Sequence, residues 1–296
     1  MAQSPRAHRL ARVTYVALIT GASSGIGEAL ARRLAREPGV ALILVARRED
    51  RLAAIAAELG CPVSWVAADL TNADAPARVL AAAEREHGVL HLLVNNAGAR
   101  WAAPFADGGY ANVAQHMEVN FSAPVRLVEA LLPLMRRTAA GGPLTAGSAE
   151  GGQRPTFGGR PLQAPVAIVN VTSTAARISR RGTGGYSAAK AALAAWSDSL
   201  ALEQAPYGVH VANVLPGFIA TEGFPQKELR ERPWTRWAVS GPQIVAEAVI
   251  DAGPGGAAER YVPRYYWLAP LLRLLAPALI RRGAASSVVS TATRDR

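Results

Sequence analysis

The chain has 296 residues, half of them apolar, and carries a formal net charge of +10. This length is enough for one large α/β domain, and the single cysteine, Cys61, excludes an internal disulfide framework and favours a reducing compartment, the cytoplasm. The arginines that supply the charge are scattered without a long basic block, so we expect no nucleic-acid partner.

Short apolar runs alternate with amphipathic runs along most of the chain. Residues 1–12 are expected to form a disordered arm, because the apolar run after them is only about seven residues long, lacks a cleavage site and leads into a glycine motif. Continuous apolar strands that alternate with helices predict an α/β fold, a doubly wound, Rossmann-like parallel sheet in a single domain over 13–259. We expect strands at 13–20, 40–46, 63–70, 90–98, 166–173 and 209–217, and helices at 25–37, 49–59, 74–87, 110–137 and 184–204.

Two stretches depart from this alternation. Residues 138–165 are rich in Gly, Pro, Ala and Ser, so we interpret them as a flexible insertion. Residues 260–282 are expected to be an apolar helical extension, too short and too interrupted to span a bilayer of roughly 30 Å. The sequence leaves three alternatives open for this extension: it caps the substrate cleft, it caps a neighbouring subunit, or it rests on a membrane surface. Residues 283–296 are expected to be a disordered tail.

A glycine-rich turn follows the first predicted strand, in the segment LITGASSGIGEAL. Gly21, Gly25 and Gly27 allow a tight turn and a close approach of the backbone to a pyrophosphate, and Ser23 and Ser24 add donors. The helix that begins here offers free N–H groups to phosphate oxygens. Placed between a strand and a helix, the turn predicts a dinucleotide site.

The second predicted strand lacks the acid of an NAD site. That acid stands about 20 residues after the glycine turn and holds the ribose 2′-hydroxyl. Here the segment VARRED places Arg47 and Arg48 in that region. A guanidinium binds a 2′-phosphate in a bidentate fork, whereas a carboxylate repels it. We therefore predict NADP(H), with the alternative that both arginines only begin a solvated helix.

A tyrosine and a lysine lie one helical turn apart in GTGGYSAAKAALAAW, as Tyr186 and Lys190. Lys190 is one of two lysines in a chain with thirty arginines. A compact ammonium beside a phenol favours the phenolate and lowers the phenol pKa, which suits acid–base chemistry near neutral pH. Ser173 precedes Tyr186 by thirteen residues, at the end of a predicted strand, where ligands bind in open α/β sheets.

These motifs resemble the short-chain dehydrogenase/reductase family, in its compact single-domain branch, over about residues 13–225. TGxxxGIG, NNAG, an asparagine at 120, Ser…YxxxK and PGFIAT occur in the order and spacing of that family. The departures are small: Thr172 replaces a common serine, Ala176 replaces a common glycine, and the insertion 138–165 is unusual. The resemblance implies an oxidoreductase that moves a hydride between nicotinamide and a carbonyl or alcohol.

The resemblance also implies roles for individual residues. Tyr186 would be the acid–base group, and Ser173 would hydrogen-bond the reacting oxygen. Lys190 would hold the nicotinamide ribose and lower the tyrosine pKa, and Asn120 would position a proton-relaying water. The implied cofactor contacts are Gly21, Ser23, Ser24, Ile26 and Gly27 for the phosphates, Asp69 and Leu70 for the adenine, Asn96, Ala97 and Gly98 for the adenosine ribose, and Pro216, Gly217, Ile219 and Thr221 for the carboxamide.

The substrate is less constrained than the cofactor. Residues 218–240 are expected to be a substrate lid, whose aromatic side chains favour an apolar ketone or alcohol or, alternatively, only pack the lid onto the body. Rival readings are a non-catalytic dinucleotide-sensing protein and a peripheral membrane-associated lipid or steroid reductase. The resemblance implies a homodimer or homotetramer built on the helices at 110–137 and 184–204. The histidines lack ligand spacing, so we expect no metal.

Overall fold

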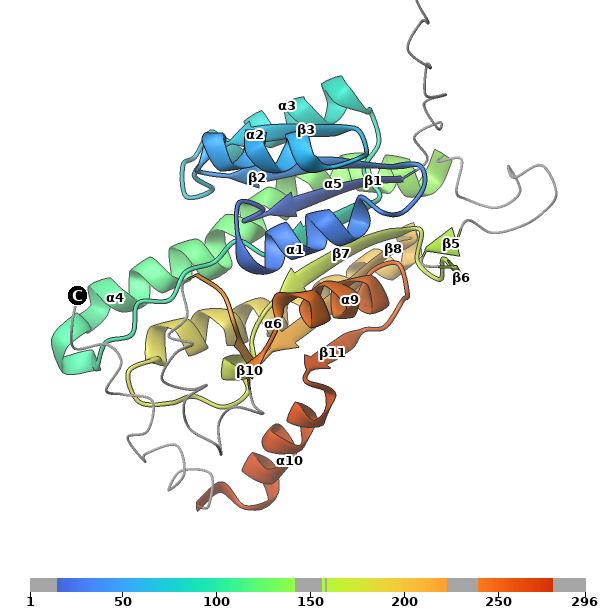
Figure 1. Cartoon of the computed structure of the whole chain (residues 1–296). Coiled ribbons are helices and arrows are strands. Elements are labelled where there is room, and N and C mark those ends of the chain that lie inside the picture. The colour runs from blue at the N-terminus through green and yellow to red at the C-terminus, as the bar shows by residue number, and fades with distance from the viewer. Residues whose placement is uncertain (1–14, 142–155, 158, 223–238, 279–296) are drawn as a thin grey trace, which may run out of the picture.

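A seven-stranded parallel sheet forms the centre of the computed structural model, which describes residues 15–141, 156–157, 159–222 and 239–278 (Figure 1). The strand order is β11-β8-β7-β4-β1-β2-β3, and each neighbouring pair is parallel. The strands are β1 (Tyr15–Thr20), β2 (Val40–Ala46), β3 (Val63–Ala67), β4 (Leu92–Asn95), β7 (Val166–Val171), β8 (Val209–Pro216) and β11 (Glu259–Val262). The expected arm at 1–12, the tail at 283–296 and most of the expected lid lie outside the described residues.

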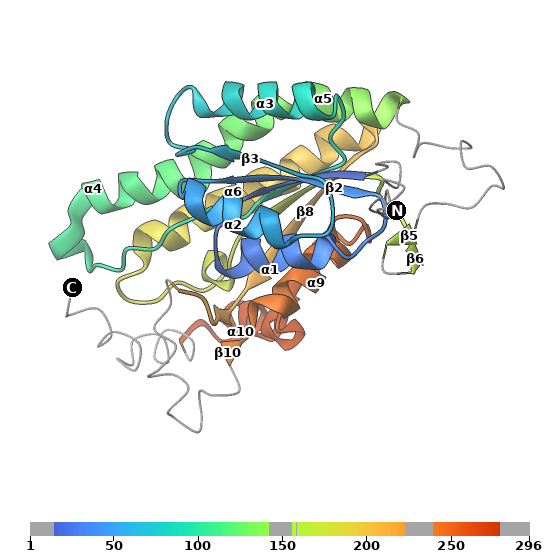
Figure 2. The ribbon, with the colours of Figure 1, turned by 45° about the horizontal axis from the view of Figure 1, so that its top comes forward.

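Helices cover both faces of this sheet, as Figure 2 shows for α1 and α9 on one side and α3 and α5 on the other. The long helices are α1 (Gly25–Leu34), α2 (Glu49–Glu58), α3 (Ala75–Glu86), α4 (Phe105–Met117), α5 (Ala123–Gly141), α6 (Gly184–Gln204) and α9 (Pro242–Ala252). The core consists of two clusters, one on each face. Along β1, Ala17 and Ile19 join the cluster with α1 and α9, whereas Val16 and Leu18 join the cluster with α3 and α5. Because both faces are covered, both sets of side chains are apolar, which confirms the predicted doubly wound fold.

Shorter elements complete the described chain. Two small sheets pair β9 (Phe218–Ile219) with β10 (Val239–Ser240), and β5 (Thr156–Phe157) with β6 (Arg160–Pro161). The short helical elements are the π-helix η1 (Glu118–Ser122), the 3-10 helices η2 (Thr174–Ala176), η3 (Ala205–Tyr207) and η4 (Arg264–Trp267), and the eight-residue helix α10 (Leu268–Leu275).

The seventh strand, β11, was not expected from the sequence. It pairs with β8 from Glu259 to Val262, so the first residues of the expected helical extension, 260–262, belong to the main sheet. The strand reads ERYV, in which two of four residues are charged. Because β11 lies at the sheet edge, these side chains reach solvent, and the segment lacks the apolar run of the inner strands.

The structure describes both ends of segment 138–165, which was expected to be a flexible insertion, and leaves residues 142–155 and 158 outside the described residues. Helix α5 continues to Gly141, and the hydroxyl of Thr138 accepts a hydrogen bond from the backbone N–H of Leu90 at 3.0 Å. At the other end Phe157 is buried, with its ring centroid 5.1 Å from that of Tyr15. Both ends of the segment therefore belong to the packed core.

The helix expected at 110–137 is divided by a π-helical turn. Helix α4 ends at Met117, η1 covers the next five residues, and α5 then begins at Ala123. Single π-helical turns inside longer helices often lie at functional sites. Here the turn carries Asn120, whose side chain is fully buried.

The turn between β1 and α1 passes very close to the end of β4. Thr20 Oγ1 accepts hydrogen bonds from the N–H groups of Asn96 and Ala97, each at 3.0 Å. A Cβ atom at Gly27 would lie 2.3 Å from the carbonyl oxygen of Gly21, a distance shorter than any non-bonded contact allows. Glycine is required at position 27 because the backbone of the turn occupies the space of a side chain.

We expect Gly27→Ala to lower the free energy of unfolding by about 1–3 kcal/mol, the usual cost of forcing extra atoms into a packed site. The matched control is Gly60→Ala, because an added Cβ there meets no atom within 4 Å. Urea unfolding of both variants measures the difference. Equal stabilities of the two variants would contradict the close approach at Gly27.

We expect Phe157→Ala to lower the free energy of unfolding by about 3 kcal/mol, because it removes a buried ring from the core. The matched control is Phe105→Ala, whose side chain is 75% exposed, and we expect a change within about 0.5 kcal/mol. Thermal and urea unfolding measure both. A neutral Phe157→Ala variant would show that the end of the expected insertion is dispensable.

Candidate active site

A cavity of about 960 Å³ runs along the carboxyl ends of the parallel strands. It crosses the point between β1 and β4 where the strand order reverses, the usual ligand site of open α/β sheets. The predicted site residues that line it are Gly21, Ser23, Ser24, Gly25, Ile26, Arg47, Arg48, Asp69, Leu70, Asn96, Ala97, Gly98, Asn120, Ser173, Tyr186, Lys190, Pro216, Gly217, Ile219 and Thr221. Gly27 does not line the cavity and instead packs behind the turn that does.

The glycine turn has the shape of a phosphate cradle. Gly21 and Gly25 adopt φ angles of 65° and 58°, which favour glycine. The carbonyl oxygen of Ser24 accepts from the N–H of Glu28 at 3.3 Å, but the Ser24 side chain caps none of the N–H groups at the start of α1. The methyl group of Thr221 lies over this turn, 3.0 Å from the position of a Cβ at Gly25. The turn and the cavity beside it fit the pyrophosphate of a dinucleotide.

At the end of β3, Asp69 is held in one orientation. Its Oδ1 accepts hydrogen bonds from the backbone N–H of Thr71 at 3.0 Å and from the Thr71 hydroxyl at 2.7 Å. These bonds, with a smaller contribution from Arg47, lower the pKa of the Asp69 carboxyl. Asp69 is therefore a fixed carboxylate at neutral pH, and it can accept a hydrogen bond from an amino group in the cavity.

The two arginines after β2 have different surroundings. Arg47 is 78% exposed, and its guanidinium lies 3.9 Å from the Asp69 carboxylate. Arg48 donates to the hydroxyl and the carbonyl oxygen of Ser23, at 3.3 and 3.2 Å, and to Glu222 at 3.3 Å.

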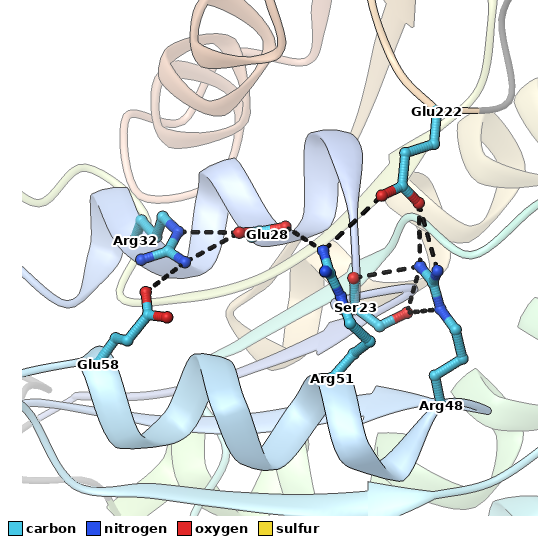
Figure 3. A network of polar contacts seen from close by, with 7 residues as sticks. All are labelled: Ser23, Glu28, Arg32, Arg48, Arg51, Glu58 and Glu222. Atoms are coloured by element: carbon cyan, nitrogen blue, oxygen red, sulfur yellow. Dashed lines mark hydrogen bonds and ion pairs between the residues drawn. The ribbon is translucent and has the colours of Figure 1, made fainter.

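Glu222, which lines the cavity, belongs to a chain of ion pairs (Figure 3). It also lies 3.7 Å from Arg51, which in turn lies 3.6 Å from Glu28. Sequence reasoning gave no role to Glu222, because it stands 174 residues from Arg48 and belongs to no motif. The Glu222 carboxylate forms an ion pair with the guanidinium of Arg48, which was expected to bind a cofactor phosphate.

Ser173 and Tyr186 meet at the other end of the cavity. The Ser173 hydroxyl accepts from the N–H of Ala175 at 3.1 Å, donates weakly to the carbonyl oxygen of Pro216 at 3.4 Å, and hydrogen-bonds Tyr186. Burial raises the pKa of Tyr186 above its usual value. The Ser173 hydrogen bond and the charges of Arg100 and Arg180 oppose that rise without reversing it.

Lys190 is buried behind Tyr186 on α6. Its Nζ donates to the carbonyl oxygen of Val171 at 2.8 Å, and burial lowers the pKa of the ammonium to about 8. The sequence suggested that Lys190 lowers the pKa of Tyr186. In the structure desolvation of the phenolate raises the tyrosine pKa, and the opposing contributions come from Ser173, Arg100 and Arg180.

Asn120 and Gly98 lie next to Lys190, and with Ser173 and Tyr186 these residues form the catalytic corner of the cavity. Asn120 Nδ2 donates to the carbonyl oxygens of Ala99 and His116, at 2.9 and 3.2 Å, and its Oδ1 accepts from the Ala99 N–H at 3.2 Å. A Cβ at Gly98 would lie 2.8 Å from Asn120 Oδ1 and 3.4 Å from Lys190 Nζ. The turn after β4, the π-helical turn and α6 therefore converge on Gly98.

Arg100 and Trp101 are cavity residues that sequence reasoning missed. The backbone N–H of Trp101 donates to His116 Nε2 at 3.1 Å, and His116 Nδ1 lies 2.8 Å from the Asn112 carbonyl oxygen. Since Nε2 accepts, Nδ1 carries the proton, and the ring fixes the loop that bears Arg100. No motif contains these residues, so their position became visible only in the fold.

Among the described residues, no group of histidine, cysteine and acidic side chains could hold a metal ion.

Comparison with known proteins agrees with this geometry. The sequence profile of the short chain dehydrogenase family matches residues 15–160 and 163–232. The chain is 29% identical over 237 residues to an uncharacterized oxidoreductase of Staphylococcus epidermidis, a match that covers 80% of this chain and 90% of the relative. It is 35% identical over 204 residues to nodulation protein G of Rhizobium sp., covering 69% and 72% of the two chains.

A further relative is serine 3-dehydrogenase of Agrobacterium fabrum, 32% identical over 206 residues, which cover 69% of this chain and 72% of that one. The family profile spans six of the seven strands of the main sheet, β1 to β4, β7 and β8, together with the glycine turn and the residues Ser173, Tyr186 and Lys190. The chain therefore belongs to the short-chain dehydrogenase family of oxidoreductases.

Proposed function

We propose that this protein is an NADP(H)-dependent oxidoreductase that interconverts a carbonyl group and a secondary alcohol on a small, apolar molecule. The observation that carries the proposal is the meeting of Ser173, Tyr186 and Lys190 in the same cavity as a glycine phosphate cradle. A nicotinamide dinucleotide supplies or accepts the hydride in this chemistry. Of the relatives named above, only serine 3-dehydrogenase has a name that states a substrate, so the substrate class rests on this chain's own residues.

Tyr186 is the proton donor for reduction. Because its pKa is raised, the phenol is protonated at neutral pH. Its Oη donates a proton to the carbonyl oxygen as the hydride reaches the carbon, and it regains a proton from solvent afterwards. Ser173, which hydrogen-bonds Tyr186, stabilises the developing charge on the same oxygen. In the oxidation direction the same two groups accept the proton and hold the alcohol.

Lys190 and Asn120 support this proton transfer. With a pKa of about 8, the Lys190 ammonium is largely protonated at pH 7. Among its contacts with described residues, one donor is used on Val171, so other N–H donors remain for ribose hydroxyls. Asn120 lines the cavity next to Lys190 and would hold a water that returns protons to the site.

The remaining cavity residues would hold the dinucleotide. Gly21, Ser23, Ser24, Gly25 and Ile26 would bind the phosphates, Asp69 and Leu70 the adenine, Asn96, Ala97 and Gly98 the adenosine ribose, and Pro216, Gly217, Ile219 and Thr221 the carboxamide. Arg47, which is exposed at the cavity mouth, and Arg48 would bind the 2′-phosphate of NADP(H).

We also propose that the protein works in the cytoplasm as a homodimer or homotetramer. The expected contact surfaces are on the helices at 110–137 and 184–204, which correspond to most of α4, to η1 and α5, and to α6. Small residues dominate the exposed and buried faces of α6, whose sequence GGYSAAKAALAAW permits close helix approach.

We expect Tyr186→Phe to lower turnover by about 10²-fold to 10⁴-fold while nucleotide binding is retained, because only the proton donor is lost. The matched control is Tyr207→Phe, which alters a half-exposed ring outside the cavity and should leave turnover unchanged. The assay follows NADPH absorbance with a panel of apolar ketones. Turnover of Tyr186→Phe near that of the unaltered enzyme would remove Tyr186 from the proposal.

We expect Glu222→Gln to tighten binding of 2′,5′-ADP about threefold to tenfold, since this change removes an exposed ion-pair competitor for Arg48. Binding of 5′-AMP, which lacks the 2′-phosphate, should not change. Calorimetric titration measures both ligands. The matched control is Glu247→Gln, because Glu247 is 57% exposed and pairs with Arg33 away from the cavity, whereas Glu222 is 59% exposed. Equal affinity of the unaltered protein for the two ligands would contradict the proposed preference for NADP(H).

A further inference from the structure

The C-terminal part of the described chain exposes an unusual density of apolar side chains. Of the fourteen large apolar residues that are exposed in the described chain, seven lie between positions 265 and 275. Their exposed fractions range from 38% to 80%. Contiguous exposed apolar surface marks a site of association in proteins. We call the set the C-terminal apolar surface: Tyr265, Trp267, Leu268, Leu271, Leu272, Leu274 and Leu275.

This surface is carried by a helix that projects from the fold. In Figure 1, η4 and α10 continue from the end of β11 and lie on neither face of the sheet. A hydrogen bond from Arg273 Nη1 to the carbonyl oxygen of Arg177 ties α10 to the body. A helix of eight residues is too short to be stable alone in water. Most positions of α10 are leucines, so the helix needs a further apolar partner to be stable.

The sequence that contains this surface has charged residues of one sign between Glu259 and Asp295. Residues 260–294 contain no aspartate or glutamate. They contain six arginines, Arg260, Arg264, Arg273, Arg281, Arg282 and Arg294. Leucines on a short helix, aromatic rings at its start and arginines along the segment are the composition of helices that lie in the interface of an anionic bilayer. No described helix is long and apolar enough to cross a membrane, so such contact would be along the surface.

The apolar surface begins at the wall of the cavity. The ring of Tyr266 fills the space beside Gly217, where a Cβ would lie 1.8 Å from the Tyr266 Cε2 atom. Gly217 lines the cavity, and its backbone N–H donates to the carbonyl oxygen of Val262 at 2.8 Å. Because β11 ends at the same edge of the sheet as the cavity, a surface bound by α10 would face the substrate end of the site.

We propose that η4 and α10 dock the protein on an anionic lipid surface and that the enzyme takes its apolar carbonyl or alcohol substrate from that surface. The docking stands on the exposed apolar residues, the one-sided charge and the position of Tyr266. The substrate source rests in addition on the oxidoreductase function proposed above.

Sedimentation with vesicles tests the docking. The full chain should bind vesicles of phosphatidylcholine with one quarter phosphatidylglycerol, and bind pure phosphatidylcholine at least tenfold more weakly. Trp267→Ser, and separately the double variant Leu274→Ser with Leu275→Ser, should weaken binding to the anionic vesicles at least fivefold. The matched control is Trp65→Ser, whose ring is 41% exposed on β3, at the opposite edge of the sheet from β11.

Three results would overturn the docking: no binding to anionic vesicles, equal loss of binding in Trp267→Ser and Trp65→Ser, or self-association in light scattering that Trp267→Ser abolishes. The last result would assign the surface to a second copy of the chain.

A kinetic comparison tests the substrate source. Anionic vesicles should raise kcat/KM for methyl octyl ketone, which partitions into lipid, and leave methyl ethyl ketone unchanged, and Trp267→Ser should remove the difference. Equal vesicle effects on both ketones would overturn the inference about the source. If neither ketone nor any other carbonyl compound is reduced while vesicle binding persists, the proposed function fails and the docking stands.

Discussion

The close contact between the β1–α1 turn and the end of β4 determines the geometry of the site. Thr20 Oγ1 accepts two backbone N–H bonds from the β4 turn, and Asn96 Nδ2 donates back to the carbonyl oxygen of Thr20 at 2.8 Å. A Cβ at Gly21 would lie 2.9 Å from the Ala97 backbone. These contacts fix the two strands at the point where the strand order reverses. The cavity, its phosphate cradle and the corner around Gly98 all depend on that spacing.

Burial is the dominant electrostatic influence in the catalytic corner. The sequence places a cation one turn from a phenol, and a simple Coulomb argument then predicts a lowered phenol pKa. In the fold desolvation raises the pKa of Tyr186, a half-buried residue, and lowers that of the buried Lys190 to about 8. Each shift favours the uncharged form of its group. A protonated tyrosine suits reduction, in which the first proton must come from the protein.

Sequence reasoning succeeded where a segment is buried on both sides or carries a motif. The expected bounds of β2 (40–46) and α6 (184–204) match the structure, because an unbroken apolar run and a long helical pattern define them. It failed for β11, an edge strand with charged residues, and for the π-helical turn, which no pattern in the sequence announces. It also predicted that Arg48 binds a phosphate but did not predict the ion pair between Arg48 and Glu222. The two residues are far apart in the sequence, and only the folded chain brings them together.

The pairing of β11 with β8 limits how far the chain can be shortened from its C-terminus. If the chain ended before Glu259, β8 would become an outer strand with a row of unpaired backbone groups. That strand is apolar and buried along nearly its whole length, so it would offer a template for joining other chains. The shortest fragment that keeps this strand covered therefore has to extend through Val262. The C-terminal region thus protects the protein from aggregation.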